Sequence, residues 1–262
     1  PVAQDDTDTT DEDTAISRDA ANGVILPNDS DPDGDTLSVD QVAGLAGNLG
    51  TAVPGSAGGT FTINADGSYD FDPDGAFEDL APGESRTTSV GYRITDGEGG
   101  TDTATLTVTV TGVNDAPVLD TAQPDQSNID GETITPVDIS GNFSDVDASD
   151  TLTFTATGLP PGLTLDPDTG VISGTLDIDA STGGPYSVTV TANDGSGTAT
   201  ATQSDTFIWT VANPVPVAQD DTDTTDEDTA ISRDAANGVI LPNDSDPDGD
   251  TLSVDQVAGL AG

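Results

Sequence analysis

Apolar and polar residues alternate along several stretches of the chain, and this alternation predicts β-strands. In TATLTVTVTG (residues 103–112) and PYSVTVTAND (185–194), threonine or serine occupies every second position among apolar residues. A period of two is typical of a strand with one buried face. The residues predicted to face a core are Leu106, Val108, Val110, Leu152, Phe154, Ala156, Val188, Val190, Phe207, Trp209 and Val211.

Turn signals separate the predicted strands. Asp-Gly, Gly-Gly and Pro-Pro pairs occur at 65–68, 95–100, 159–163 and 193–197, where they favour hairpins and loops. The chain has 30 glycines and 17 prolines and few strong helix formers, so no long helix is expected. The predicted fold class is all-β, built from small β-sandwich domains.

An internal repeat sets the predicted domain boundaries. Residues 216–262 copy residues 1–47 letter for letter, and proline-ending linkers lie at 112–117 (GVNDAP) and 211–216 (VANPVP). We therefore expect sandwiches at 1–116 and 117–215, followed at 216–262 by the first half of another repeat. This half lacks most partner strands, so we expect it to be poorly ordered alone or to borrow strands from a neighbouring molecule, giving weak self-association.

The composition limits which catalytic and metal-binding groups the chain can provide. The chain has 49 acidic residues, 4 arginines as its basic residues and a formal net charge of −45, with no lysine, histidine, cysteine or methionine. Imidazole bases, thiol or amine nucleophiles and nitrogen or sulfur metal ligands are thereby excluded, so we expect no enzyme. The charge disfavours nucleic acid and anionic membranes, and no apolar run has the length of a membrane span or a signal peptide. Strong charge with 4% aromatic residues can also indicate disorder, but the ordered alternation argues against it.

The acidic residues follow a metal-ligand spacing in three loops. Asp29, Asp31 and Asp33 alternate before Gly34, and the same pattern returns at Asp244, Asp246 and Asp248. A shorter form appears at Asp145, Asp147 and Asp150. Alternating carboxylates before a glycine can surround one hard cation, so Ca²⁺ is the expected ligand, although an EF-hand is disfavoured because the flanks are not helical. The alternative is that these acids only solvate the surface.

One further acidic string fits this spacing less well. Asp70, Asp72 and Asp74 precede Gly75, but they lie in a probable strand, where alternate carboxylates more often face solvent.

Several longer motifs resemble known families. The segments DEDTAI (11–16), LPNDSDPDGDTLSV (26–39), FEDLAPGES (77–85) and YRITDGEGGTDTATLTVTVTGVNDAP (92–117) are similar to the VCBS repeat, a bacterial cadherin-like domain. NFSDVDASDTLTF (142–154), GLPPGLTLDPDTGVISGTL (158–176) and VTANDGSG (190–197) resemble the dystroglycan-type cadherin-like domain, an immunoglobulin-like module. The resemblance covers nearly the whole chain.

The resemblance implies seven-stranded Greek-key sandwiches that bind Ca²⁺ where consecutive domains meet, in large type I secreted, RTX-type adhesins. It assigns the first junction to Glu12, Asn114, Asp115, Asp145, Asp147 and Asp194. It assigns the second to Asp177, Asp179, Asp130 or Glu132, Asn213, Asp244 and Asp246. Asp29, Asp31 and Asp96 would face whatever precedes residue 1. The acidic segment that cadherin-type domains carry in mid-domain, with a sequence like LDRE, is missing from the first domain. Glu78, Asp79 and Glu84 are therefore weaker candidates for metal ligands.

The expected function is that of a spacer in a bacterial cell-surface adhesin, stiffened by Ca²⁺ against neighbouring repeats of the same chain. Two alternatives stay open. A glycan- or protein-binding module would need an exposed aromatic or a shaped groove, and a purely solvating acidic segment would not explain the loop spacing.

Overall fold

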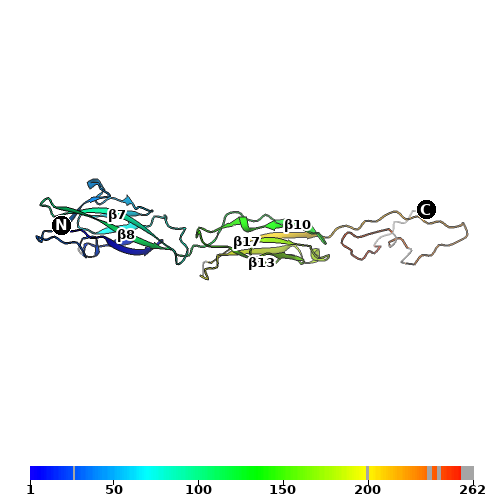
Figure 1. Ribbon diagram of the computed structural model, residues 1–262. Coiled ribbons are helices and arrows are strands. Elements are labelled where there is room, and N and C mark those ends of the chain that lie inside the picture. The colour runs from blue at the N-terminus through cyan, green and yellow to red at the C-terminus, as the bar shows by residue number, and fades with distance from the viewer. Residues whose placement is uncertain (26, 199–200, 235–237, 241–242, 255–262) are drawn as a thin grey trace. The chain divides into compact units, whose positions relative to one another are not determined.

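The computed structural model describes residues 1–25, 27–198, 201–234, 238–240 and 243–254, and it is shown in Figure 1. By internal contacts the chain divides into two compact units. Unit 1 comprises Pro1–Pro117 with the loops Asp145–Thr151 and Asp194–Ala201. Unit 2 comprises Val118–Ser144, Leu152–Asn193 and Thr202–Gly262.

Unit 1 is a sandwich of two four-stranded sheets. One sheet has the order β1 (Asp6–Asp11), β8 (Thr101–Thr111), β7 (Ser85–Thr95) and β3 (Ser38–Val42). The other has the order β2 (Ile16–Arg18), β6 (Tyr69–Asp72), β5 (Thr60–Ile63) and β4 (Val53–Pro54). β1 runs parallel to β8, and the other pairs are antiparallel.

The core of unit 1 lies between these sheets and follows the alternation of the sequence. Leu106, Val108 and Val110 of β8 are fully buried, whereas the threonines between them face outward. The rings of Phe61 and Phe71 pack with their centroids 4.7 Å apart. Close packing also explains Gly59, because a Cβ there would lie 2.6 Å from the Phe71 ring and the backbone φ is +67°.

Unit 2 has one four-stranded sheet and two smaller ones. The largest has the order β10 (Gln126–Ile129), β17 (Thr202–Ala212), β16 (Tyr186–Asn193) and β13 (Thr153–Thr157). The smaller sheets are β11 (Val137–Asp138) with β15 (Val171–Gly174) and β14 (Leu163–Leu165), and β12 (Phe143–Ser144) with β9 (Val118–Leu119).

The core of unit 2 is centred on Trp209. This side chain is fully buried, its ring centroid lies 6.1 Å from that of Phe207, and its indole N–H donates to Oδ1 of Asn128 at 3.0 Å. All the residues predicted to face the two cores are buried except Leu152 and Ala156, which are half-buried and pack against the second core.

The predicted all-β class of tandem sandwiches is confirmed. In the described part of the chain the helical segments are four short 3₁₀ turns, η1 (Ala20–Asn22), η2 (Ala46–Asn48), η3 (Ser140–Asn142) and η4 (Ala180–Gly183). No helix there is long and apolar enough to cross a membrane.

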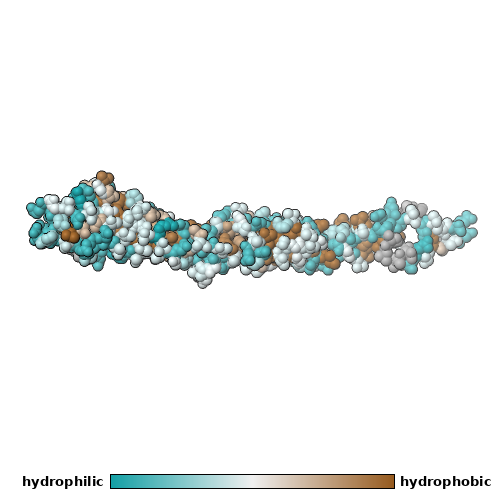
Figure 2. Space-filling model, viewed as in Figure 1, coloured by the Kyte–Doolittle hydropathy of each residue, from teal (hydrophilic) through white to brown (hydrophobic). Residues whose placement is uncertain are grey.

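The second copy of the repeated sequence differs from the first in structure. Among the described residues after Pro216 no strand is assigned, and the one β-bridge joins Val217 to Ser245. Exposed apolar residues in this part of the chain include Ile231 at 42% and Val239 at 60%, whereas their counterparts Ile16 and Val24 are buried. Figure 2 shows the surface of the molecule coloured by hydropathy.

Candidate metal centre

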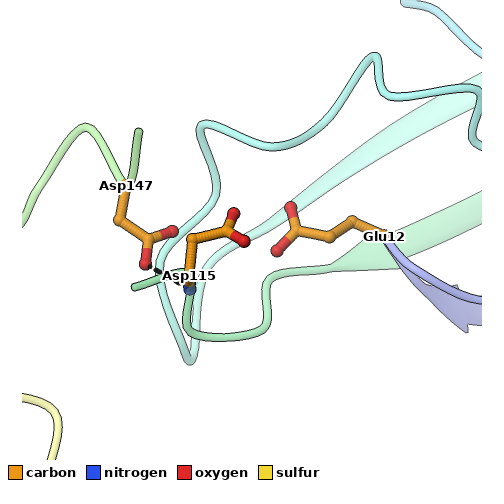
Figure 3. A group of neighbouring side chains, drawn as sticks. All are labelled: Glu12, Asp115 and Asp147. Atoms are coloured by element: carbon orange, nitrogen blue, oxygen red, sulfur yellow. Dashed lines mark hydrogen bonds between the residues drawn. The ribbon is translucent and has the colours of Figure 1, made fainter. Parts of the chain in front are cut away.

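Three carboxylates from separate segments meet in unit 1. They belong to Glu12, Asp115 and Asp147, and one oxygen of each lies within 4.8 Å of the others. Figure 3 shows the Glu12 and Asp115 carboxylates pointing toward one another, with Asp147 beside Asp115. We call this group the first trio.

The parallel pairing of β1 with β8 accounts for two members of the first trio. Asp11 is the register partner of Thr111, so the residues that follow both strands leave the same end of the sheet. The backbone N–H of Glu12 donates to the carbonyl of Thr111 at 3.0 Å, and Oε1 of Glu12 accepts from the N–H of Val113 at 2.7 Å. Glu12 is therefore fixed beside the segment that carries Asp115.

The loop 145–151 supplies the third member. The backbone N–H of Asp115 donates to Oδ2 of Asp147 at 3.0 Å, and the N–H of Ala148 donates to the carbonyl of Asp79 at 3.2 Å. The loop is folded on itself by a bond from the Asp147 N–H to Oδ1 of Asp145, at 3.1 Å.

A second trio lies in the same unit and consists of Asp145, Asp150 and Asp194. Asn114 connects the two trios, because its side-chain amide donates to Oδ2 of Asp194 at 3.2 Å and to the carbonyl of Asp115 at 2.6 Å. All six residues that the family resemblance assigns to the first junction therefore belong to one connected acidic group.

Several oxygens of this group are buried without a hydrogen-bond partner. The side chains of Glu12, Asp147 and Asp194 are only 3%, 2% and 6% exposed. The oxygens without a partner are Asp11 Oδ1, Glu12 Oε2, Asn114 Oδ1, Asp115 Oδ2, Asp145 Oδ2 and Asp147 Oδ1. A buried carboxylate oxygen that lacks a partner is costly, and a set composed only of oxygens suits a hard cation such as Ca²⁺. The residues present thus fit a calcium site.

Burial and mutual repulsion disfavour the charged forms of these groups. Burial, with smaller contributions from Asp115, Glu78 and Asp147, raises the pKa of Glu12 to about 7. Burial also raises the pKa of Asp147 to about 6, and burial followed by the charges of Asp13 and Asp145 raises the pKa of Asp115. A bound cation would reverse this preference.

The arginine side chains form ion pairs with aspartates outside the two trios. Each of the four arginines forms an ion pair with one aspartate outside the two trios, at N–O distances of 2.6–2.8 Å. The pairs are Arg18–Asp8, Arg86–Asp79, Arg93–Asp40 and Arg233–Asp223. These arginines therefore do not neutralise the trios directly.

Unit 2 contains another acidic group. Asp130 is 4% exposed, and its Oδ1 accepts from the N–H of Ser181 at 2.7 Å while its Oδ2 has no partner. Asp248 also has a buried oxygen without a partner, and it lies close to Gly131, the residue after Asp130, because a Cβ placed on Gly131 would be 3.5 Å from the Asp248 Cβ. Asp246, Asp248 and Asp250 form a close trio.

Other predicted ligands of the second junction lie outside such a trio in the described chain. Asp179 is the N-cap residue of η4, Asp177 lies near Tyr186, and Asn213 follows β17. Oδ1 of Asp244 accepts from the N–H of Gln219 at 2.7 Å. The structure therefore gathers fewer of the proposed ligands here than in unit 1.

A third group lies near residue 1. Asp31, Asp33 and Asp35 form a close trio. Asp29 accepts from the N–H of Gln4 at 2.7 Å, its other oxygen is buried without a partner, and burial raises its pKa to about 6. Asp96 instead accepts from the N–H groups of its own turn, at Glu98 and Gly100.

Four residues of these groups were not among the ligands predicted from the sequence. Asp35 and Asp250 continue the alternate spacing past the glycine, so the sequence carried a signal for both. Asp150 was noted as part of the shorter acidic string, and Asp11 stands next to Glu12. Asp70, Asp72 and Asp74 are absent from the close trios of the described residues.

Two family models match consecutive parts of the chain. Residues 1–112 match the family model "Bacterial cadherin-like domain", and residues 116–212 match the model "Putative Ig domain". Two consecutive segments of the chain are thus similar to a cadherin-like and an Ig-like domain, and residues 216–262 repeat the sequence of residues 1–47. No match was found among curated proteins.

Solved structures with this fold include cadherin fragments. The human mucin-like protocadherin EC1-2 matches with a TM-score of 0.51 and 16% identity, covering 80% of this chain and 96% of that one. Mouse cadherin-23 EC22-24 matches with a TM-score of 0.51 and 14% identity, covering 82% and 67%. At such identities the likeness establishes the fold alone. Cadherin-like domains are typically extracellular adhesion or structural modules, and they generally bind Ca²⁺.

Proposed function

We propose that this chain is a calcium-binding spacer of a bacterial cell-surface adhesin, in which Ca²⁺ fixes the connection between consecutive domains. The observation that carries the proposal is the first trio. Its three carboxylates come from the end of β1, from the linker after β8 and from the loop that connects β12 to β13. Binding at this group would therefore hold the linker and a loop of the next domain to the end of the first sandwich.

The residues of the chain have defined parts in this proposal. Glu12, Asp115 and Asp147 would bind one ion, and Asn114, Asp145 and Asp194 carry the oxygens for an adjacent one. A bound Ca²⁺ supplies positive charge that offsets the repulsion among these carboxylates. Without it, the charged forms oppose one another across the linker, and the linker is expected to lose its fixed position.

A sugar-binding role has less support. Stacking on a sugar needs an accessible ring, but Trp209, Phe61, Phe71 and Phe77 are fully buried. The spacer role agrees better with the described aromatic residues, because these build the cores.

The test is thermal unfolding by calorimetry in EDTA and in increasing free Ca²⁺, with NaCl at matched ionic strength as the control. Selective binding to the folded state predicts stabilisation by about 2.7 kcal/mol when the free ion reaches about 100 times its Kd. Small-angle scattering in both conditions would report whether the chain stiffens. Identical melting and scattering curves in EDTA and in millimolar Ca²⁺ would contradict the proposal.

A further inference from the structure

One short segment of unit 1 contacts both the linker and the loop that carry members of the first trio. Residues 77–84 lie between β6 and β7, and we call them the 77–84 segment. The carbonyl of Asp79 accepts from the N–H of Ala148, in the loop, at 3.2 Å. The carbonyl of Glu84 accepts from the N–H of Gly112, at the start of the linker, at 3.1 Å. The position of this segment therefore helps to decide where the loop and the linker lie.

The contact between the segment and the linker is tightly packed. A Cβ built on Gly112 would overlap the carbonyl oxygens of Leu80 and Ala81, so this close approach requires glycine. The N–H of the next residue, Val113, donates to Oε1 of Glu12 at 2.7 Å. A member of the first trio is thus bonded directly beside the packed contact.

Electrostatic repulsion acts against this arrangement. Burial raises the pKa of Glu78, and the charge of Asp115 contributes to the rise. Burial also raises the pKa of Asp150, and the charge of Glu84 is among the contributions. Acidic side chains of the 77–84 segment therefore border both trios, and their charged forms repel those of the trios.

Arg86 provides an attraction that holds the segment in place. Its two terminal nitrogens donate to the two carboxylate oxygens of Asp79, at 3.0 and 2.6 Å. Its Cζ lies 5.9 Å from the ring centroid of Phe77, which is fully buried. Arg86 is two residues from the buried Thr88, so the alternation of β7 directs both side chains to the same face. A two-point ion pair and a contact with an aromatic face fix the orientation as well as the position of the segment.

We propose that Arg86 is a positioning residue of the calcium site, because it holds the 77–84 segment and thereby fixes the loop and the linker that carry the ligands. This role rests on the proposed function and deepens it, since it assigns control of Ca²⁺ affinity to a residue outside the two trios. Both carboxylate oxygens of Asp79 accept from Arg86, so Asp79 holds the segment and is not itself a ligand. Without Arg86, the segment moves away from the acidic groups that repel it, and the ligands lose their common centre.

Arg93 provides a matched control on the same strand. It donates to both carboxylate oxygens of Asp40, at 2.9 and 2.7 Å. Its side chain is 32% exposed, close to the 37% of Arg86. Arg86→Gln and Arg93→Gln therefore remove the same charge and the same kind of ion pair, but only the first of these pairs holds the 77–84 segment.

The two variants separate positioning from charge. By charge alone, the loss of either arginine makes the protein more negative and should strengthen Ca²⁺ binding. We expect instead that Arg86→Gln weakens Ca²⁺ binding about tenfold, whereas Arg93→Gln changes it by less than about twofold. Calorimetric titration of the full chain with Ca²⁺ measures both. If Arg86→Gln binds Ca²⁺ as tightly as Arg93→Gln or the unsubstituted chain, the proposal is overturned.

Hydrogen exchange in EDTA tests the positioning without Ca²⁺. The N–H of Ala148 donates to Asp79, so NMR should show its exchange at least about tenfold faster in Arg86→Gln and unchanged in Arg93→Gln. Unchanged exchange at Ala148 in Arg86→Gln would overturn the proposal even if Ca²⁺ binding were weaker. Faster exchange there, in a chain whose unsubstituted form binds no Ca²⁺, would reject the proposed function and the effect on affinity but support the hold of Arg86 on the loop.

Discussion

The backbone N–H of Asp115 donates to Oδ2 of Asp147 at 3.0 Å, although the residues lie on opposite sides of β9–β12 in the sequence. The bond satisfies one oxygen of Asp147 and leaves Oδ1 buried without a partner. The backbone thus positions the carboxylate but does not neutralise it, so we expect the first trio to respond to pH and, in the proposed function, to cations.

The first prediction concerns a ligand of the first trio. Glu12→Gln should weaken Ca²⁺ binding at this site by about tenfold or more, because it removes a charged oxygen ligand. The control is Glu227→Gln, which changes the same residue in the same local sequence but at an exposed position. Calorimetric titration would measure both. Equal Ca²⁺ affinities for the two variants would show that Glu12 is not a ligand at this site.

A second prediction concerns pH in the absence of divalent cations. The pKa of Glu12 is raised from 4.5 to about 7, so folding favours its protonated form, and stability should fall as the pH rises from about 5 to about 8. Asp147 and Asp29, with pKa values raised to about 6, act in the same direction. The combined loss should be about 1–3 kcal/mol.

Calorimetry in EDTA across this pH range would measure the loss, and Glu12→Gln should reduce the slope. Below about pH 4 the trend reverses, because Arg93 lowers the pKa of Asp40 and protonation breaks that pair. Stability that rises steadily from pH 5 to pH 8 in EDTA would be inconsistent with the raised pKa values.

A third prediction compares the two copies by truncation. Val24→Ala should destabilise unit 1 by about 2 kcal/mol, since it removes two buried methyl groups. Val239→Ala should change the free energy of unfolding by no more than about 0.5 kcal/mol, because Val239 is exposed. Chemical denaturation of both variants provides the measurement, and equal losses would mean that both copies are packed.

A fourth prediction uses limited proteolysis. Arg18 and Arg233 lie in the same sequence, but Arg18 is within β2, paired with β6, whereas Arg233 is in no strand. Trypsin should therefore cut after Arg233 well before it cuts after Arg18, because cleavage requires local opening of the backbone. Mass spectrometry of the earliest fragments would identify the site, and early cleavage after Arg18 would count against a stable pairing of β2 with β6.

The strands and cores were predictable because their signal is local. The alternation around Leu106 and Trp209 shows which side of each strand is buried without reference to the rest of the chain. The parallel pairing of β1 with β8 has no such signal, because its partners are about 100 residues apart and the register depends on the whole sandwich.

For the candidate site, the sequence predicted the ligand residues but not how they come together. Spacing and resemblance identified Glu12, Asp115 and Asp147, but their proximity follows from the β1–β8 register and from the position of the loop 145–151. The grouping of Asp150 with Asp145 and Asp194 likewise depends on how two loops fold. The sequence also assigned Asp177 and Asp179 to a metal site, and their place in one stays a prediction.

Trp209 gives the chain a spectroscopic label that needs no engineering. It is the sole tryptophan, and it is fully buried in unit 2. Excitation at the long-wavelength edge of the tyrosine absorption band selects the tryptophan, so the emission reports the environment of unit 2. Tyr69 and Tyr92, which belong to unit 1, contribute little to it. A shift of this emission to longer wavelength on heating would mark the opening of the second sandwich, and comparison with the calorimetric trace would separate its melting from that of the first.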